Sequence, residues 1–127
     1  MSNPTKAEKE YWSKVAALGC IACRLGGVHS PVVSIHHTEG RTKPGAHKKV
    51  LPLCAEHHQT GGAAAPSVHP WKARFEAKYG AQDLLVRLVR LLVGAPDGAQ
   101  NVLLKDHAQA VLEDKCSGIT HFMTGAT

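Results

Sequence analysis

Cysteine and histidine residues, which are soft metal ligands, are concentrated in one stretch of the chain. Seven of the nine histidines lie between His29 and His69, and three of the four cysteines precede residue 55. Histidines scattered over a protein surface would not be crowded in this way. The first question for this sequence is therefore which of these side chains share a metal ion.

Four of these side chains have the spacing of a structural zinc site. Cys20 and Cys23 form a CxxC, and after a spacer of 30 residues Cys54 is followed at its third position by His57. Thiolate and imidazole ligands in two such pairs suit tetrahedral zinc. Spacing alone leaves the fourth ligand open between His57 and His58, because both lie within one helical turn of Cys54.

A redox-active CxxC is the competing interpretation. Such a pair needs a strand before it and a helix after it. Here Thr5 and Glu8 form a capping box that predicts a helix ending at Gly19, directly before the CxxC, and two glycines follow the motif. A structural zinc ion is therefore favoured, and it contributes on the order of 10 kcal/mol to the folding of a small domain.

The segment after the CxxC predicts two short strands and a helical turn. The expected order is strand, loop, strand and helical turn, over residues 31–35, 40–45, 50–53 and 54–59. Pro52 restricts the second strand to an edge position or a strand end. The first strand delivers His36 and His37 to its end.

The C-terminal half reads as three helices. The first, from residue 69 to 78, has an aromatic face expected in the core, formed by Trp71, Phe75 and Tyr79. The second has an apolar face formed by Leu84, Leu85, Leu88, Leu91 and Leu92. The third is expected to end near Gly118, before a flexible tail from Ile119, with Cys116 as a spare thiol. The predicted organisation is a main unit over residues 1–94 and a C-terminal helix with its tail over 95–127.

The order of the motifs resembles the HNH endonucleases, also called ββα-metal or His-Me finger nucleases. The shared features are the His36-His37 pair, a glycine-containing loop, and a VLPLC segment followed by AEHH. This resemblance implies an α+β fold, a small zinc-braced ββα-metal (HNH) finger with flanking helices. It also implies that His36 and His58 bind a catalytic metal ion, that His37 is the general base, and that His57 completes the zinc site.

A closer resemblance is to the phage recombination-enhancement (Ref-type) nucleases, whose name implies dependence on a RecA filament. It is carried by PLCAEHH, by Val68-His69 and by FEAKYG over residues 75–80, and it covers roughly residues 6–92. His69 is either a further ligand of the catalytic ion or a helix-cap histidine. The chain departs from the HNH pattern at Lys49, where the family has an asparagine, and His47 is the nearest polar candidate.

The residue types explain the chemistry that the resemblance implies. His37 titrates near neutral pH and can take a proton from the attacking water. A divalent cation, Mg²⁺, Mn²⁺ or Zn²⁺, on His36 and His58 would act as a Lewis acid. Because these ligands are imidazoles, we expect Mn²⁺, Zn²⁺ or Ni²⁺ to compete well with Mg²⁺.

Charge and composition are compatible with DNA as the partner. The chain of 127 residues carries a net charge of +5, and its low aromatic content of 5% argues against a protein that binds single strands by base stacking. Four basic side chains are predicted to contact phosphates, Arg41, Lys43, Lys48 and Lys49, although a solvated loop would have the same composition. The polar N-terminus and the lack of a long apolar run predict a cytoplasmic protein without a membrane partner.

A zinc-stabilised, non-catalytic DNA-binding or adaptor module is the alternative function. The cysteines and the basic loop fit both interpretations. A structural zinc ion needs only four ligands, so the adjacent His36 and His37 and the additional His58 favour the nuclease.

Overall fold

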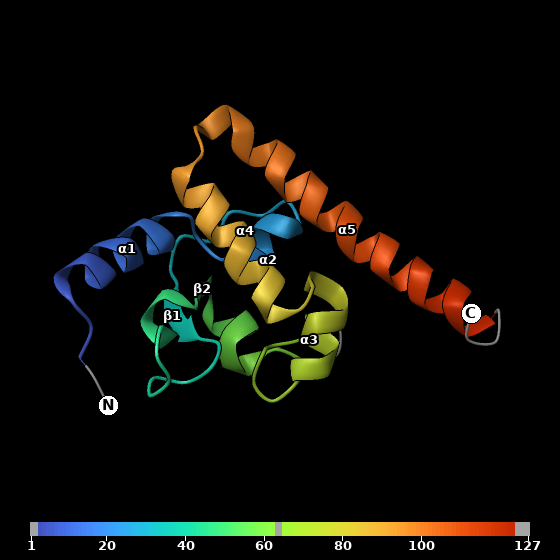
Figure 1. The fold of residues 1–127 in the computed structure, drawn as a ribbon, viewed down its shortest axis with the longest axis horizontal. Helices are drawn as coiled ribbons and strands as arrows, with labels where there is room; N and C mark the ends of the chain where they lie inside the picture. The colour runs from blue at the N-terminus through green and yellow to red at the C-terminus, as the bar shows by residue number, and fades with distance from the viewer. Residues whose placement is uncertain (1–2, 63–64, 124–127) are drawn as a thin grey trace.

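The computed structural model describes residues 3–62 and 65–123, with side-chain surroundings up to residue 113, and has a small α+β architecture. The chain has one described sheet, of two strands, and Figure 1 shows it with helices around it. In chain order the elements are α1 (Lys6–Ala17), α2 (Ile21–Leu25), β1 (Ser34–His37), η1 (Ala46–Lys48), β2 (Val50–Leu53), η2 (Glu56–Thr60), α3 (Lys72–Tyr79), α4 (Gln82–Gly94) and α5 (Asp97–Met123).

Helix α1 begins with the predicted capping box. The Thr5 hydroxyl accepts from the Glu8 backbone N–H at 3.1 Å, and the Glu8 carboxylate accepts from the Thr5 N–H at 2.8 Å. The helix ends at Ala17, and Gly19 follows with a φ of 78°, a left-handed conformation that favours glycine. This turn leads directly into the CxxC, as the sequence indicated.

The sheet is an antiparallel hairpin, and its first strand begins later than predicted. β1 covers Ser34–His37 rather than residues 31–35, so His36 and His37 lie within the strand. Ile35 is paired with Pro52, and the Thr38 N–H donates to the Lys49 carbonyl at 3.0 Å. Since bonded and non-bonded pairs alternate, Pro52 occupies a non-bonded pair and no ladder hydrogen bond is lost.

The expected helical turn after β2 is a π-helical turn, η2. It follows Cys54 and Ala55 and includes both His57 and His58. It therefore stands where an HNH finger would have its α-helix. The ββα-metal finger itself stays a prediction.

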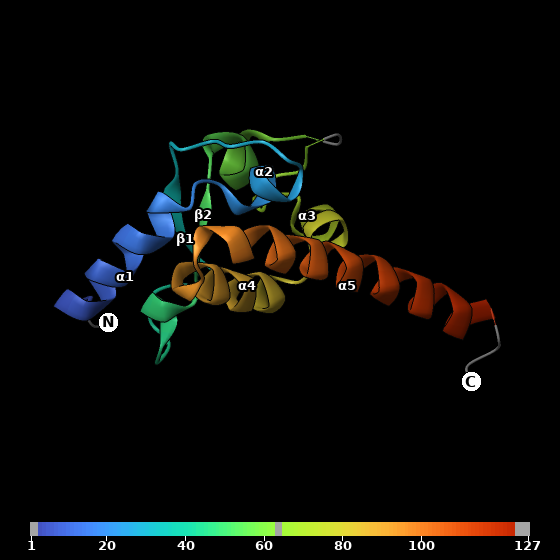
Figure 2. The ribbon, with the colours of Figure 1, turned by 90° about the horizontal axis from the view of Figure 1, so that it is seen from above.

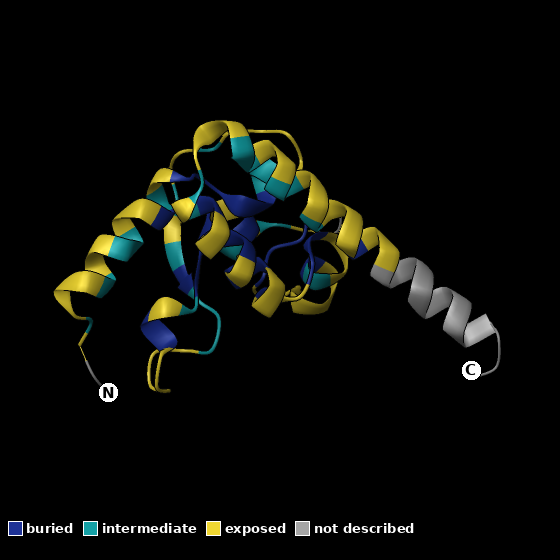
Figure 3. Cartoon of the chain, turned by 45° about the horizontal axis from the view of Figure 1, so that its top comes forward, coloured by how far each residue is buried: buried dark blue, intermediate teal, exposed yellow. Residues whose placement is uncertain are grey.

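The core lies where β2, α2, α3 and α4 meet, shown by the dark blue segments near the centre of Figure 3.

The buried face of α4 differs from the predicted one. Leu84 and Leu91 are 46% and 51% exposed, because they stand seven residues apart on the outer edge of α4. The side chains of α4 that fill the core are Leu85, Val86, Leu88, Val89 and Leu92.

Trp71 was also expected in the core, but it is 37% exposed and the Arg74 guanidinium lies 4.9 Å from its ring centre. Trp71 is the residue before α3 and has non-helical backbone angles, so it does not share the helical face of Phe75 and Tyr79. Those two side chains are buried.

Helix α5 is longer than the sequence indicated. It runs past Gly118 to Met123, and residues 124–127 of the predicted tail lie outside the described residues, as does the side chain of Cys116. Figure 2 shows its first half lying along α4 and its second half extending beyond the other elements. Among residues 3–62 and 65–123, no helix has both the length and the apolar character needed to cross a membrane.

Candidate metal centres

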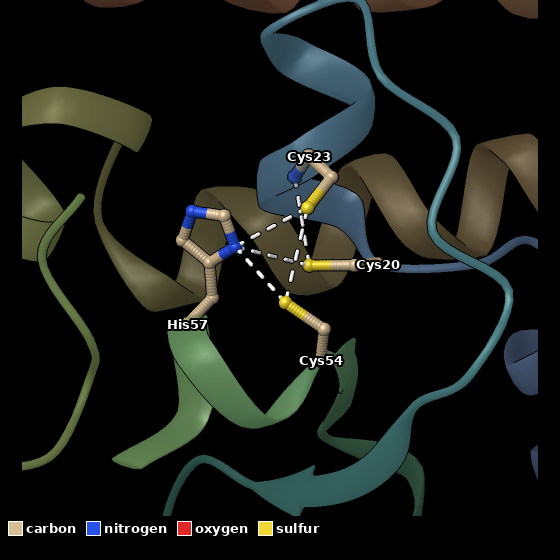
Figure 4. Close-up of side chains that lie close together, drawn as sticks. All are labelled: Cys20, Cys23, Cys54 and His57. Atoms are coloured by element: carbon tan, nitrogen blue, oxygen red, sulfur yellow. Dashed lines mark hydrogen bonds between the residues drawn. The ribbon is translucent and has the colours of Figure 1, made fainter. Parts of the chain in front are cut away.

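The first candidate centre is formed by three cysteines and one histidine, drawn in Figure 4. Cys20 precedes α2, and its thiol accepts from the Cys23 N–H at 3.5 Å, which turns both sulfurs to the same side. Cys54 directly follows β2, and His57 lies in η2. The fold thus brings together the four residues that the sequence proposed for zinc, with His57 rather than His58 beside the cysteines.

The distances between these ligand atoms fit a tetrahedral zinc ion. The Nδ1 atom of His57 lies 3.5, 3.4 and 3.3 Å from the Sγ atoms of Cys20, Cys23 and Cys54, and the last two sulfurs are 3.8 Å apart. Zinc–ligand bonds of about 2.3 Å to sulfur and about 2.0 Å to nitrogen give tetrahedral edges of about 3.8 Å and about 3.5 Å. The cluster can therefore hold a structural metal ion such as zinc.

The electrostatics of this cluster also favour a cation. Burial raises the pKa of the Cys20 thiol to about 12, and the neighbouring cysteines add to the rise. Thiols crowded in this way deprotonate only when a positive charge lies among them. A bound zinc ion would supply that charge.

The second candidate centre is a cluster of three histidines, His36, His58 and His69. One ring nitrogen from each lies within 4.8 Å of the others. His36 is buried in β1, His58 is half-buried in η2, and His69 is exposed before α3. Burial lowers the pKa of His36 to about 4 and also lowers the pKa of His58. Both rings are therefore neutral at pH 7, the form that binds a metal ion.

Backbone hydrogen bonds explain why His69 joins this cluster. The Val68 N–H donates to the His57 carbonyl at 2.8 Å, and the His69 N–H donates to the His58 carbonyl at 3.1 Å. The helix-cap interpretation of His69 is wrong, because α3 begins at Lys72 and no side chain caps it. These two hydrogen bonds tie the segment before α3 to η2.

Each of the two η2 histidines has a partner that orients its ring. The Ser34 hydroxyl donates to the Leu53 carbonyl at 3.4 Å, so its oxygen accepts from Nδ1 of His58 at 2.9 Å and leaves Nε2 for a metal ion. The Tyr79 hydroxyl lies 3.0 Å from Nε2 of His57, which leaves Nδ1 for the thiolate cluster. Such outer partners fix the tautomer of a ligating histidine.

His37 lies apart from the three-histidine cluster. Neighbouring residues of a strand point to opposite faces, so His37 faces away from His36. Its Nε2 atom lies 3.1 Å from Nδ1 of His47, and the ring of Trp12 contacts both imidazoles with centroid distances of 5.3 and 5.5 Å. Burial, aided by the positive charge of Arg41, lowers the pKa of His37.

The contact between His37 and His47 was missed by sequence reasoning, which named His47 only as a polar candidate for the family asparagine. His47 lies in the η1 turn, and the Trp12 indole N–H donates to the His47 carbonyl at 2.6 Å. The pairing therefore depends on the docking of α1 against η1. No local sequence signal connects positions 12, 37 and 47.

The predicted phosphate-binding residues differ in their surroundings. Arg41, Lys43 and Lys48 are exposed in the segment between the strands. Lys49 is half-buried and forms an ion pair with Glu39 at 3.0 Å. An open groove of about 410 Å³ lies beside this pair and adds two arginines of α4 that the sequence analysis had not assigned, Arg87 and Arg90.

Most of the chain matches a known protein family. Residues 4–93 match the family described as recombination enhancement, RecA-dependent nuclease. The matched region contains both candidate metal centres, and it ends one residue before the end of α4.

Proposed function

The chain belongs to the recombination-enhancement, RecA-dependent nuclease family, and we propose that it is a metal-dependent endonuclease of HNH type that hydrolyses phosphodiester bonds in DNA. The proposal depends mainly on one observation: the adjacent residues His57 and His58 belong to two different ligand clusters. A structural zinc ion accounts for the first cluster. It leaves the cluster of His36, His58 and His69 without a structural purpose.

The three-histidine cluster has the composition of a catalytic site. Three protein ligands leave coordination positions free for a substrate, whereas structural zinc sites have four. A divalent cation held there supplies Lewis-acid stabilisation of the charge that develops on the phosphate and on the leaving oxygen. His36 and His58 are neutral at pH 7 because of burial, so they can hold the cation without first losing a proton.

We assign the general base to His37. Its pKa is lowered, so the imidazole is neutral at pH 7 and can accept a proton from water. The hydrogen bond with His47 holds the ring in place on the face of β1 opposite His36. Because the two histidines are consecutive, a substrate at this edge of the hairpin would meet the cation on one side and the base on the other.

DNA is the substrate that the surface charge fits. Arg41, Lys43 and Lys48 project from the segment that follows His37, where they would contact phosphates independently of sequence. Lys49 has a smaller share in this contact, since its charge is paired with Glu39. We propose a RecA filament as the partner, on the basis of the family description.

Cleavage of single-stranded and duplex DNA, with Mg²⁺, Mn²⁺ or EDTA and with or without a RecA filament, tests this function. His58→Ala should abolish cutting, and His37→Ala should slow it by about 100- to 10,000-fold. The matched control is His29→Ala, which removes an exposed histidine outside both clusters. A folded, zinc-loaded protein that binds DNA and never cuts it would instead indicate the non-catalytic binding module.

A further inference from the structure

His36, the buried member of the three-histidine cluster, has a hydrogen-bond partner from a distant element, α4. Its Nε2 atom lies 2.9 Å from the side-chain oxygen of Gln82, the first residue of α4. Gln82 is only 8% exposed, and His36 only 6%. Neither side chain can replace this hydrogen bond with one to water, because both are buried. Loss of one partner would therefore leave the other without a hydrogen bond.

The chemistry of the pair determines which nitrogen of His36 is free. An amide oxygen only accepts, so the hydrogen must be on Nε2 of the imidazole. A neutral imidazole carries one hydrogen, and Nδ1 therefore keeps its lone pair. His36 can bind a cation through this Nδ1 atom. The other two ligands of that cation would be His58 from η2 and His69 from the segment before α3.

Gln82 is itself held in place. The residue before α4 is Ala81, which has no side chain able to cap the helix. The Glu76 carboxylate of α3 takes that role and accepts from the Gln82 backbone N–H at 3.1 Å. The carboxylate thereby fixes the start of α4, and the start of α4 fixes the amide that faces His36.

We propose that Gln82 is a positioning residue of the proposed metal centre, which sets the tautomer and the orientation of His36. This inference rests on the proposed function, because it takes the three-histidine cluster to be a cation site. Outer partners of this kind typically change metal affinity about 10- to 100-fold when they are removed. Gln82 would thus make α4 a supporting element of the site.

The test compares three variants of the zinc-loaded protein. Gln82→Met keeps the length of the side chain and removes the acceptor, Gln82→Glu keeps an acceptor oxygen, and Gln109→Met makes the first change on an exposed face of α5. Mn²⁺ binding is measured by electron paramagnetic resonance. The His36 tautomer is read from long-range ¹H–¹⁵N spectra without Mn²⁺, and thermal unfolding checks the fold.

We expect His36 to be protonated on Nε2 in the wild type and in Gln82→Glu, and to become a mixture of tautomers in Gln82→Met. Mn²⁺ affinity should fall about 10- to 100-fold in Gln82→Met, and it should be restored to near the wild-type value in Gln82→Glu. The control Gln109→Met should match the wild type in both measurements.

Two results would overturn the proposal, and they differ in what else they overturn. If the wild type binds Mn²⁺ and cuts DNA, and Gln82→Met has the same affinity and tautomer, only the role of Gln82 is wrong. If the wild type binds no cation beyond its zinc and cuts no DNA, the cation site and the proposed function are wrong as well.

Discussion

The hydroxyl oxygen of Tyr79 lies 3.0 Å from Nε2 of His57, so the last residue of α3 orients a ligand of the candidate zinc site. The backbone carbonyl of Tyr79 accepts from Nε2 of His107, in α5, at 2.7 Å. One tyrosine thus connects the cysteine cluster with the C-terminal helix.

Removal of the Tyr79 hydroxyl should weaken zinc binding without unfolding the protein. Tyr79→Phe keeps the buried ring and removes the partner of His57, so zinc affinity should fall about 10- to 100-fold. Competition with a coloured chelator measures this. Tyr11→Phe removes the hydroxyl of a half-buried tyrosine away from the cluster, and it should leave the zinc affinity unchanged. Equal affinities in both variants would contradict the orienting role of Tyr79.

Removal of the metal from the cysteine cluster should unfold the domain. Structural zinc contributes on the order of 10 kcal/mol, which is comparable to the whole stability of a small domain. Circular dichroism should therefore show loss of helix on chelation and recovery when zinc is returned. Cys54→Ser should behave like the chelated protein at all zinc concentrations. Retention of the helical signal after complete zinc removal would argue against a structural metal.

Acid should destabilise the fold through His36. Burial lowers the pKa of this histidine from 6.5 to about 4, so between these values the unfolded chain binds a proton that the folded chain does not. The stability contributed by neutral His36 is then fully present above pH 6.5 and is lost as the pH falls toward 4. Urea unfolding at several pH values should show a smaller acid loss in His36→Gln than in the wild type. His29→Gln, at an exposed position, should keep the wild-type slope.

Gly80 should not tolerate a side chain. Its φ is 106°, and an added Cβ would lie 3.0 Å from Nε2 of His107 and 3.0 Å from Cγ2 of Val111. Gly80→Ala should cost about 1–3 kcal/mol, measured by thermal or urea unfolding. The control is Gly98→Ala in α5, where an added Cβ meets nothing within 4 Å, and this change should stabilise the helix slightly. Equal stability of both variants would contradict the packing of α5 against the end of α3.

Substitution of the exposed basic residues should reduce the salt dependence of DNA binding. Each lost phosphate contact lowers the slope of log affinity against log salt by about 0.9 on duplex DNA. The double change Arg41→Ala and Lys43→Ala should therefore lower it by about 2. Lys49→Ala should have a smaller effect because its charge is paired with Glu39. A change on α5, Lys105→Ala, serves as the control, and a slope reduced equally by all three variants would contradict a specific contact surface.

The sequence predicted those features that depend on local pattern. The capping box of Thr5 and Glu8 is present, and the spacing of the cysteines pointed to three of the ligands that the fold brings together, with the fourth open between His57 and His58. Each signal came from residues a few positions apart, whereas the fold brings the two ligand pairs together across the 30-residue spacer. The resemblance to the recombination-enhancement nucleases was also confirmed, by the match over residues 4–93, whereas the HNH resemblance stays a prediction.

The features that the sequence missed depend on contacts between distant residues. Gln82 stands 46 residues after its partner His36, and His47 meets His37 only because Trp12 of α1 holds the η1 turn. The exposure of Trp71 follows from where α3 begins, at Lys72, which the aromatic periodicity did not reveal. In each case tertiary packing, rather than local pattern, determines the position of the side chain.

The placement of His57 and His58 as neighbours in η2 makes the two proposed metal sites thermodynamically linked. An ion bound through His57 restricts the backbone that carries His58, so the second ion meets a ligand that has already lost part of its freedom. Linkage is reciprocal, and the second ion must therefore tighten the first by the same factor. Occupancy of the proposed catalytic centre would thereby raise the affinity for structural zinc. Cation binding at the catalytic centre and the stability of the fold would then both depend on one five-residue turn.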